Sequence, residues 1–149
     1  MRIEDEIKQK DFKDDYRRLL VNLLFTNNWL NQQLMPFFKE FDLTLQQHNV
    51  LGIVRGQHPK PVCFGDIQSR MVDRNSNVTR LIDKLIEKGY VTRDICAANR
   101  RMIEVRITEK GLQVLDQVDT KFPELFGRFH NLSQEEAVLA SNLLDKLRG

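Results

Sequence analysis

The sequence predicts a mainly α-helical protein with one small β-hairpin, and three observations support that fold class. Apolar residues recur at three- and four-residue spacing along most of the chain, which is the period of amphipathic helices. Two runs, residues 90–95 and 102–107, instead alternate polar with apolar side chains and are rich in β-branched residues, as hairpin strands are. The length of 149 residues, 41% hydrophobic and 30% charged, fits one globular domain. We therefore expect a single domain over residues 1–149.

A long first helix is expected over residues 9–41. Its apolar repeat consists of Phe12, Tyr16, Leu19 or Leu20, Leu23, Leu30, Leu34, Phe37 or Phe38, and Phe41. Leu24, Phe25 and Trp29 widen this stripe beyond the surface that one neighbouring helix would cover. Pro36 removes a helical hydrogen bond and should kink the helix or break it near Leu34. We expect a bend rather than a straight rod.

A second helix should start at Leu45, because Thr44 and Gln47 have the spacing of a capping box. It should run to about Gly56. Residues 58–61 (HPKP) exclude helix and predict an extended connection, because each proline restricts itself and the residue before it.

A helix-turn-helix pair is expected next, preceded by a candidate short strand at Val62. Residues 64–71 are short and polar on one side, as its first helix should be. Ile67 and Met71 lie four residues apart, so both should pack against the apolar stripe of the second helix.

The second helix of the pair has one apolar and one polar face. The apolar stripe is formed by Val78, Leu81, Ile82 and Leu85. Asn75 or Ser76 can cap its first turn, and Gly89 supplies the left-handed residue that ends it. The polar face carries Ser76, Asn77, Arg80, Asp83, Lys84 and Glu87, with Thr79 at its edge. Small hydroxyl and amide groups followed by an arginine suit insertion into the major groove of DNA.

The hairpin after this helix should carry a basic tip of Asn99, Arg100 and Arg101. A helix suited to the major groove followed by a basic hairpin is a winged helix-turn-helix, so we expect double-stranded DNA as the partner. The expected groove residues are Ser76, Asn77, Thr79 and Arg80, the expected phosphate contacts are Arg74 and Lys84, and Arg100 and Arg101 should reach the backbone or minor groove.

The distribution of charge agrees with a DNA partner. Residues 1–54 carry 7 Lys/Arg against 8 Asp/Glu, residues 55–110 carry 12 against 7, and residues 111–149 carry 4 against 6. The positive charge is therefore concentrated in the segment that holds the predicted helix-turn-helix and hairpin.

Two further helices are expected at the C-terminal end. The first should start after Thr108, bend at Pro123, and pass through Leu112, Leu115, Val118, Phe122 and Phe126. Ser133 and Glu136 form a second capping box, and the last helix has a wide apolar face of Val138, Leu139, Leu143, Leu144 and Leu147. Broad apolar faces on the first and last helices exceed what one monomer of this size readily covers, although a monomeric core is the alternative.

The ordered set of motifs resembles the MarR family of bacterial transcriptional regulators. The matching segments are residues 76–85 (SNVTRLIDKL), 88–91 (KGYV), 99–101 (NRR) and 107–111 (ITEKG), and more loosely 43–44 (LT) and 132–136 (LSQEE). Two departures are Gln68, where the family usually has a small residue, and Asn99, where the wing usually has an Asp.

The resemblance implies a homodimeric repressor that is controlled by a small molecule and binds a pseudo-palindromic operator. In that arrangement residues of about 44–110 form the DNA-binding lobe, and about 9–41 and 111–149 form dimerisation helices. An effector pocket for a small aromatic or amphipathic molecule is implied where these helices meet the lobe. Phe25, Trp29 and Phe41 are aromatic candidates to line it, with packing in the core as the alternative for each.

Other features argue against membrane, metal and redox functions. The N-terminus lacks the apolar run of a signal peptide and no stretch approaches the ~18 apolar residues of a membrane span, so a cytoplasmic location is expected. Cys63 and Cys96 have no CxxC spacing and should be reduced thiols; a redox role for Cys96 is the less favoured alternative to a small half-buried residue. His48, His58 and His130 are far apart in sequence and do not predict a metal site.

No enzyme or cofactor is expected, because the sequence has no Gly-rich phosphate loop, no G-x-S-x-G turn and no HExxH motif. The alternative to DNA binding is a helical dimeric protein-interaction module whose winged helix does not contact DNA. Salt dependence separates the two, because binding to duplex DNA releases counterions and weakens steeply as salt rises.

Overall fold

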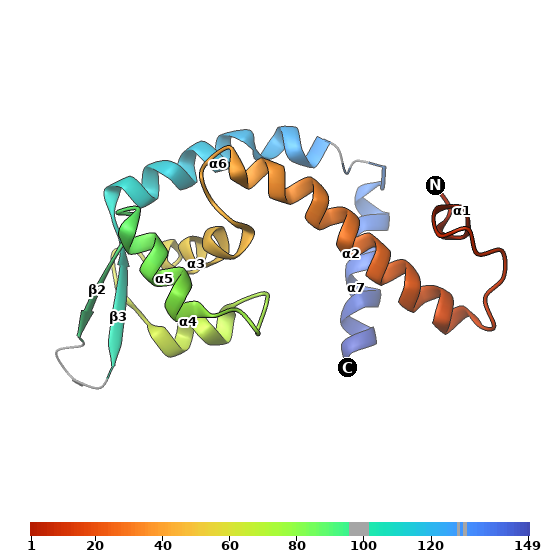
Figure 1. The fold of residues 1–149 in the computed structure, drawn as a ribbon, viewed down its shortest axis with the longest axis horizontal. Coiled ribbons are helices and arrows are strands. Elements are labelled where there is room, and N and C mark those ends of the chain that lie inside the picture. Colours follow the sequence, from red (N-terminus) through yellow and green to blue (C-terminus); the bar gives the residue numbers. More distant parts are fainter. Residues whose placement is uncertain (96–101, 128, 130) are drawn as a thin grey trace.

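The computed structural model describes residues 1–95, 102–127, 129 and 131–149 (Figure 1). Its elements are α1 (Ile3–Glu6), α2 (Asp15–Lys39), α3 (Leu45–Arg55), β1 (Val62–Cys63), α4 (Phe64–Arg70), α5 (Val78–Glu87), β2 (Val91–Ile95), β3 (Ile103–Ile107), α6 (Glu109–Gly127) and α7 (Gln134–Arg148). Elements α3 to β3 gather at one end of the molecule, and we call them the lobe (Figure 1). Helices α2 and α6 extend from the lobe towards α7 and α1 at the other end (Figure 1). The predicted mainly α fold with a small sheet is confirmed.

Helix α2 begins later than the sequence pattern predicted. The Asp14 carboxylate accepts a hydrogen bond from the backbone N–H of Arg17 at 2.9 Å, so Asp14 is the N-cap and residues 9–14 are not part of the helix. Pro36 lies inside α2, which continues to Lys39, so a break near Leu34 is excluded. One proline removes only one helical hydrogen bond, and Phe37 and Phe38 anchor the last turn in the core.

Helix α1 packs against α2, although the sequence pattern did not predict it. The guanidinium of Arg18 donates a hydrogen bond to the Glu4 carboxylate at 2.6 Å, and Ile3 is buried. That hydrogen bond lowers the pKa of Glu4 from 4.5 to about 2, so the carboxylate is ionised across the physiological range.

The predicted capping boxes are confirmed, because their partners lie only three residues apart. In α3 the Thr44 hydroxyl accepts from the backbone N–H of Gln47, and the Gln47 side chain accepts in return from that of Thr44. Ser133 and Glu136 form the same pair at the start of α7. The extended connection predicted for residues 58–61 is wrong. Residues 56–59 form turns, and the His58–Pro59 peptide is cis.

The sheet has three antiparallel strands in the order β1-β3-β2. The predicted hairpin is confirmed as β2 and β3, which pair from Val91 with Ile107 to Ile95 with Ile103. The candidate strand at Val62 is also confirmed, since β1 pairs Val62 with Val105 on the other edge of β3. The central strand therefore fixes the hairpin to the segment that leads into α4.

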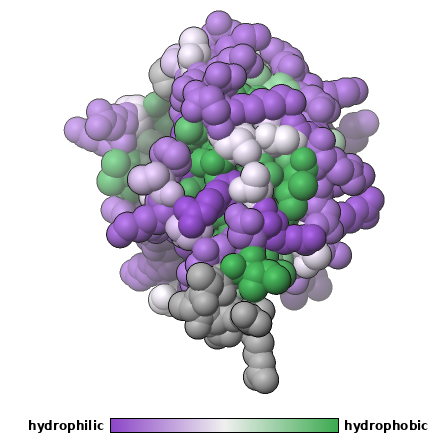
Figure 2. Space-filling model, turned by 90° about the vertical axis from the view of Figure 1, so that its left-hand side faces the viewer, coloured by the Kyte–Doolittle hydropathy of each residue, from purple (hydrophilic) through white to green (hydrophobic). Residues whose placement is uncertain are grey.

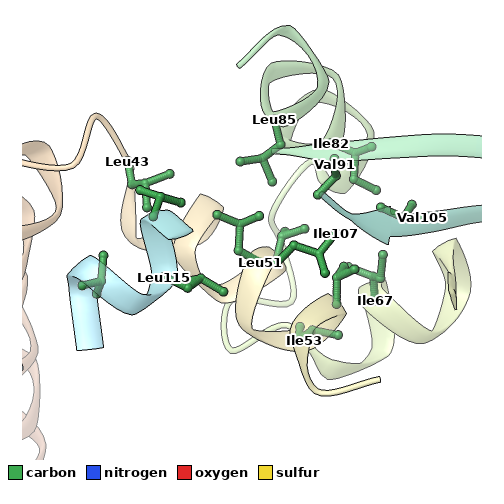
Figure 3. Packing of buried hydrophobic residues seen from close by; sticks show 14 of the residues in the cluster. Leu43, Leu51, Ile53, Ile67, Ile82, Leu85, Val91, Val105, Ile107 and Leu115 are labelled. Carbon is green, nitrogen blue, oxygen red and sulfur yellow. The ribbon is translucent and has the colours of Figure 1, made fainter. Parts of the chain in front are cut away.

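The hydrophobic core lies in the lobe and extends along α6. Figure 3 shows Ile82 and Leu85 of α5 close to Val91, with Ile67 of α4 near Val105 and Leu51 of α3 in the middle of the cluster. Leu115 joins α6 to this cluster and is fully buried. Ile67 and Met71 belong to the same buried cluster as Val78, Ile82 and Leu85 of the α5 stripe, and Leu81 packs against that cluster, as the expected pairing of α4 with α5 requires.

Apolar side chains on α2 and α7 remain exposed in the single chain. On α2 these are Tyr16, Leu19, Leu20, Leu24 and Met35, and on α7 they are Val138, Leu139, Leu143, Leu144 and Leu147. Helix α7 has no buried residue, although it carries a capping box and a wide apolar face. In the part of the chain that the structure describes, no helix combines the length and the apolar character needed to cross a membrane.

Candidate nucleic-acid interface

The N-terminal end of α5 presents the predicted groove residues. Asn77 is the N-cap: its Oδ1 accepts a hydrogen bond from the backbone N–H of Arg80 at 3.1 Å. This corrects the expectation that Asn75 or Ser76 would cap the helix. Asn77 therefore holds the first turn of α5, and its Oδ1 has a partner within the protein.

Thr79 and Arg80 lie exposed in the first turn of α5, whereas Val78 between them and the cap is buried. The Oγ of Ser76 is buried and has no hydrogen-bond partner among the described residues, so this hydroxyl does not lie on the exposed surface. Arg74 is exposed in the turn before the helix. Within the described part of the chain, neither Arg74 nor Arg80 forms an ion pair. Both guanidinium groups are thus available to an external anion.

The middle of the polar face of α5 is partly occupied by ion pairs. Lys84 Nζ lies 2.8 Å from Glu87 Oε2, and Arg93 Nη1 of β2 lies 3.0 Å from Asp83 Oδ1. All four side chains are between 45% and 62% exposed, so solvent screens these pairs and each adds little stability. The Asp83–Arg93 pair connects the polar face of α5 to the hairpin.

Residues 71–77, which we call the connector, join α4 to α5 and are held by side chains from two helices. Asn49 Oδ1 of α3 accepts from the backbone N–H of Val72 at 2.9 Å, and Gln68 Nε2 of α4 donates to the Arg74 carbonyl at 3.3 Å. Asp73 adds a local bond, because its Oδ1 accepts from the backbone N–H of Asn75 at 3.0 Å. The position of the Asn77 cap therefore depends on residues distant in sequence.

The C-terminal end of α5 is fixed to the start of α6 by side chains that donate hydrogen bonds to backbone carbonyls. Gly89 adopts a φ of 75° and ends the helix as predicted. The Thr108 hydroxyl donates to the Gly89 carbonyl at 2.7 Å, and Lys110 Nζ donates to the Lys88 carbonyl at 2.8 Å. A Cβ on Gly111 would lie only 2.2 Å from the Tyr90 carbonyl oxygen, so this close approach requires glycine.

The tip of the hairpin lies outside the described residues. It includes the predicted wing arginines Arg100 and Arg101, together with Asn99 and Cys96. The end of the molecule that carries β2 and β3 is largely hydrophilic, with smaller apolar areas between the polar side chains (Figure 2).

A cavity of about 550 Å³ lies where α2 and α3 meet the connector. Its lining consists of Asn27, Asn31, Leu45, Gln46, His48, Asn49, Gly52, Val72 and Asp73. The three aromatic residues proposed from the sequence lie elsewhere. Phe25 and Trp29 line a separate cavity of about 150 Å³ beside α1, and the ring of Phe41 packs 5.4 Å from that of Phe37.

His48 lies between this cavity and an aromatic cluster on α2 and α6. Its ring centroid is 4.6 Å from that of Phe38 and 5.6 Å from that of Phe122. Burial lowers the pKa of His48 below its ordinary 6.5; the carboxylate of Asp119 opposes this shift, and the positive charge of Arg55 reinforces it. Within residues 1–95, 102–127, 129 and 131–149, no three His, Cys, Asp or Glu side chains are grouped to hold a metal ion.

Comparison with known proteins agrees with this geometry. The model of the MarR family matches residues 43–103. An uncharacterized HTH-type transcriptional regulator of Bacillus subtilis, YpoP, is 32% identical over 108 residues, which cover 71% of this chain and 74% of that protein. The HTH-type transcriptional repressor IacR of Pseudomonas putida is 25% identical, over 95% of this chain and 80% of that protein. A solved structure of mutant MarR from E. coli complexed with operator DNA superimposes with a TM-score of 0.80 at 23% identity, covering 93% of this chain and 99% of that one.

A capped helix with an exposed polar face beside a three-stranded sheet, and two arginines near its start that form no ion pair among the described residues, are the features of a winged helix-turn-helix transcriptional regulator that binds DNA. The similarity to YpoP and the match to the family model identify the chain further. It belongs to the MarR family. The expectation that it is not an enzyme agrees with the family, whose members are transcriptional regulators.

Sequence reasoning missed the supporting roles of three residues. These are Asn49 and Gln68, which hydrogen-bond the connector, and Arg93, which pairs with Asp83. Each acts on a partner from another element, at separations of 23, 6 and 10 residues. Strand alternation would have placed Arg93 on one face of β2, but nothing in the sequence indicates that this face meets Asp83. Tertiary packing sets these contacts.

Proposed function

We propose that this chain is a homodimeric repressor that binds a pseudo-palindromic operator and is controlled by a small molecule. The observation that supports DNA binding is the exposed start of α5. There Thr79 and Arg80 follow the Asn77 cap, and Arg80 has no ion pair among the described residues. In support, a protein of the same fold was solved with operator DNA, and the Pseudomonas putida relative is named a repressor.

In the proposed complex, Thr79 and Arg80 enter the major groove, where an arginine pairs best with guanine. Arg74 and Lys84 contact phosphates on either side, with Lys84 exchanging its exposed partner Glu87 for the DNA backbone. Asn77 caps the start of the helix beside the DNA backbone, whereas the buried hydroxyl of Ser76 keeps this side chain out of the groove. Arg100 and Arg101 reach the flanking backbone or minor groove.

The dimer proposal rests on apolar surface that one chain leaves uncovered. Tyr16 is 83% exposed, and the five large apolar side chains of α7 are between 38% and 58% exposed. Continuous apolar faces of this kind mark interaction sites in soluble proteins, and a two-fold arrangement lets identical faces cover each other. Two reading helices related by that axis would bind half-sites about 10 bp apart centre to centre.

The effector proposal places a small amphipathic molecule in the cavity between α2, α3 and the connector. This cavity is where the helices outside the lobe meet the lobe, and its lining combines amide side chains with the apolar Leu45 and Val72. Gly52 faces its open space, since a Cβ there would meet no atom within 4 Å. Phe25 and Trp29 are a second candidate site beside α1, and Phe41 is a candidate only if its packing against Phe37 opens.

The proposed function is tested by footprinting the protein on the DNA upstream of its own coding region, and by measuring affinity for the protected duplex as salt rises. Binding as a dimer to a two-fold site, with a log–log salt slope of about −0.9 per neutralised phosphate, is the expected result. Absence of binding to any duplex at low salt would reject it and favour a protein-interaction module.

A further inference from the structure

The cavity between α2, α3 and the connector shares one wall with the segment that positions the reading helix. Val72 and Asp73 of the connector line this wall, and Asn27 and Asn31 of α2 also line the cavity. The connector ends at Asn77, whose side chain caps α5. A change in the connector is therefore transmitted along the backbone to the first turn of the reading helix.

Asn49 is the residue that belongs to both the cavity and the connector's support. It is half-buried on α3 and lines the cavity, and its Oδ1 accepts a hydrogen bond from the backbone N–H of Val72 at 2.9 Å. Gln68 also holds the connector, through the Arg74 carbonyl, but it does not line the cavity. Among the described residues, the bond from Val72 to Asn49 is the one side-chain hydrogen bond between the connector and a cavity-lining residue of another element, since Asp73 bonds Asn75 within the connector.

We propose that Asn49 is a positioning residue that couples occupancy of the cavity to DNA reading by α5. A molecule in the cavity with an N–H or O–H group can donate to Asn49 Oδ1 in place of the Val72 N–H. The connector is then held by Gln68 alone among the neighbouring helices, so the Asn77 cap and the first turn of α5 lose their fixed position. The proposal rests on the cavity being the effector site of the proposed function.

The lining also indicates which molecules are suited to this exchange. It provides amide groups from Asn27, Asn31, Gln46 and Asn49 and the carboxylate of Asp73, and none of the described residues that line it is Lys or Arg. Burial also favours the neutral form of His48, the one lining residue that could carry a positive charge near neutral pH. The favoured ligand class is therefore a neutral or cationic molecule with a hydrogen-bond donor and an apolar part, rather than a carboxylate.

The test compares Asn49→Leu with Asn31→Leu in the full-length chain. The two substitutions make the same chemical change in the same cavity, but only the first removes the acceptor of Val72. DNA affinity is measured on the duplex that wild-type protein selects from a random pool, and exchange of the Val72 amide hydrogen is followed by NMR. Asn49→Leu should weaken binding to that duplex and speed Val72 exchange by about five-fold each, the effect of one ordinary hydrogen bond. Asn31→Leu should change neither.

Asn49→Asp provides a second variant, because its carboxylate keeps an acceptor at the same position. It should keep the slow exchange of Val72, even though its added negative charge affects DNA affinity. Equal DNA affinity of Asn49→Leu and Asn31→Leu, or fast Val72 exchange in Asn49→Asp, would overturn the coupling. Wild-type binding to the selected duplex is judged separately, so the proposed function can stand when the coupling fails.

Discussion

At the residue scale, Asn77 and Arg80 divide two tasks at the start of α5. Asn77 stabilises the helix through its cap, while Arg80 supplies an exposed guanidinium with no ion pair in the described part of the chain. Sequence patterning placed both on the polar face, but it could not distinguish them. Three consecutive residues, Asn75, Ser76 and Asn77, all favour the cap position, and the connector's tertiary contacts select Asn77.

Substituting these two residues should therefore affect different properties. Asn77→Ala should lower the free energy of unfolding by about 0.5–2 kcal/mol, the usual cost of losing a cap, whereas Asn77→Ser should retain most of it. Arg80→Ala should leave unfolding unchanged and weaken operator binding by ~1–3 kcal/mol if it pairs with a base. Urea unfolding and DNA titration measure the two effects. A stable, weakly binding Asn77→Ala protein would assign Asn77 to DNA contact instead.

His48 should make the fold sensitive to acid. Its pKa is lowered chiefly by burial, so the unfolded chain binds a proton more readily than the folded protein does. The stability that follows from a neutral His48 is present above about pH 6.5 and is lost as the pH falls through that value towards the folded pKa. His48→Phe keeps an aromatic ring beside Phe38 and removes the titration. Unfolding free energies at about pH 7.5 and pH 5.5 should differ less for this variant than for wild type; equal differences would exclude His48.

At the element scale, helix starts were predictable where the sequence carries both side chains of a capping box. The boxes at Thr44 and Ser133 are such cases. The start of α2 was placed too early, because Phe12 continues the apolar period although Asp14 interrupts the backbone pattern with its own cap. Periodicity records which side chains face the core and not where the helical hydrogen bonds begin.

The junction between α5 and α6 should tolerate no side chain at its closest point. Gly111→Ala places a Cβ 2.2 Å from the Tyr90 carbonyl oxygen, so the backbones must move apart and the variant should lose about 1–3 kcal/mol of unfolding free energy. Gly52→Ala is the matched control, because its Cβ meets no atom within 4 Å and alanine favours helix by up to about 1 kcal/mol. Thermal unfolding should therefore shift in opposite directions. A Gly111→Ala protein as stable as wild type would mean that this junction is loosely packed.

At the scale of the whole molecule, the long helices are organised around surface that a single chain leaves uncovered. The sequence predicted these wide apolar faces on the first and last helices, and α2 and α7 show them exposed. It did not predict which aromatic residues line which cavity. A wide stripe shows that a helix has several neighbours, but only packing shows that Phe25 and Trp29 face α1 while Phe41 faces Phe37.

A charge on the apolar face of α7 should separate the subunits of the proposed dimer. Leu143→Asp would bury an unpaired carboxylate in the interface, which costs several kcal/mol, so both association and operator binding should be lost. Ser141→Asp introduces the same group on the opposite side of the helix and should preserve both. Sedimentation gives the mass, and circular dichroism checks the fold. A folded Leu143→Asp monomer with wild-type operator affinity would contradict the dimer.

The hydrogen bonds that hold the end of α5 to the start of α6 have a consequence for how such a protein can diversify. Thr108 and Lys110 hold carbonyl groups at Gly89 and Lys88, and these bonds do not depend on the identity of the groove-facing side chains. Thr79 and Arg80 contribute nothing to this attachment. Both residues can therefore be substituted to change the recognised base sequence while the fold is retained. They are the natural positions to randomise when redirecting the regulator to a new promoter.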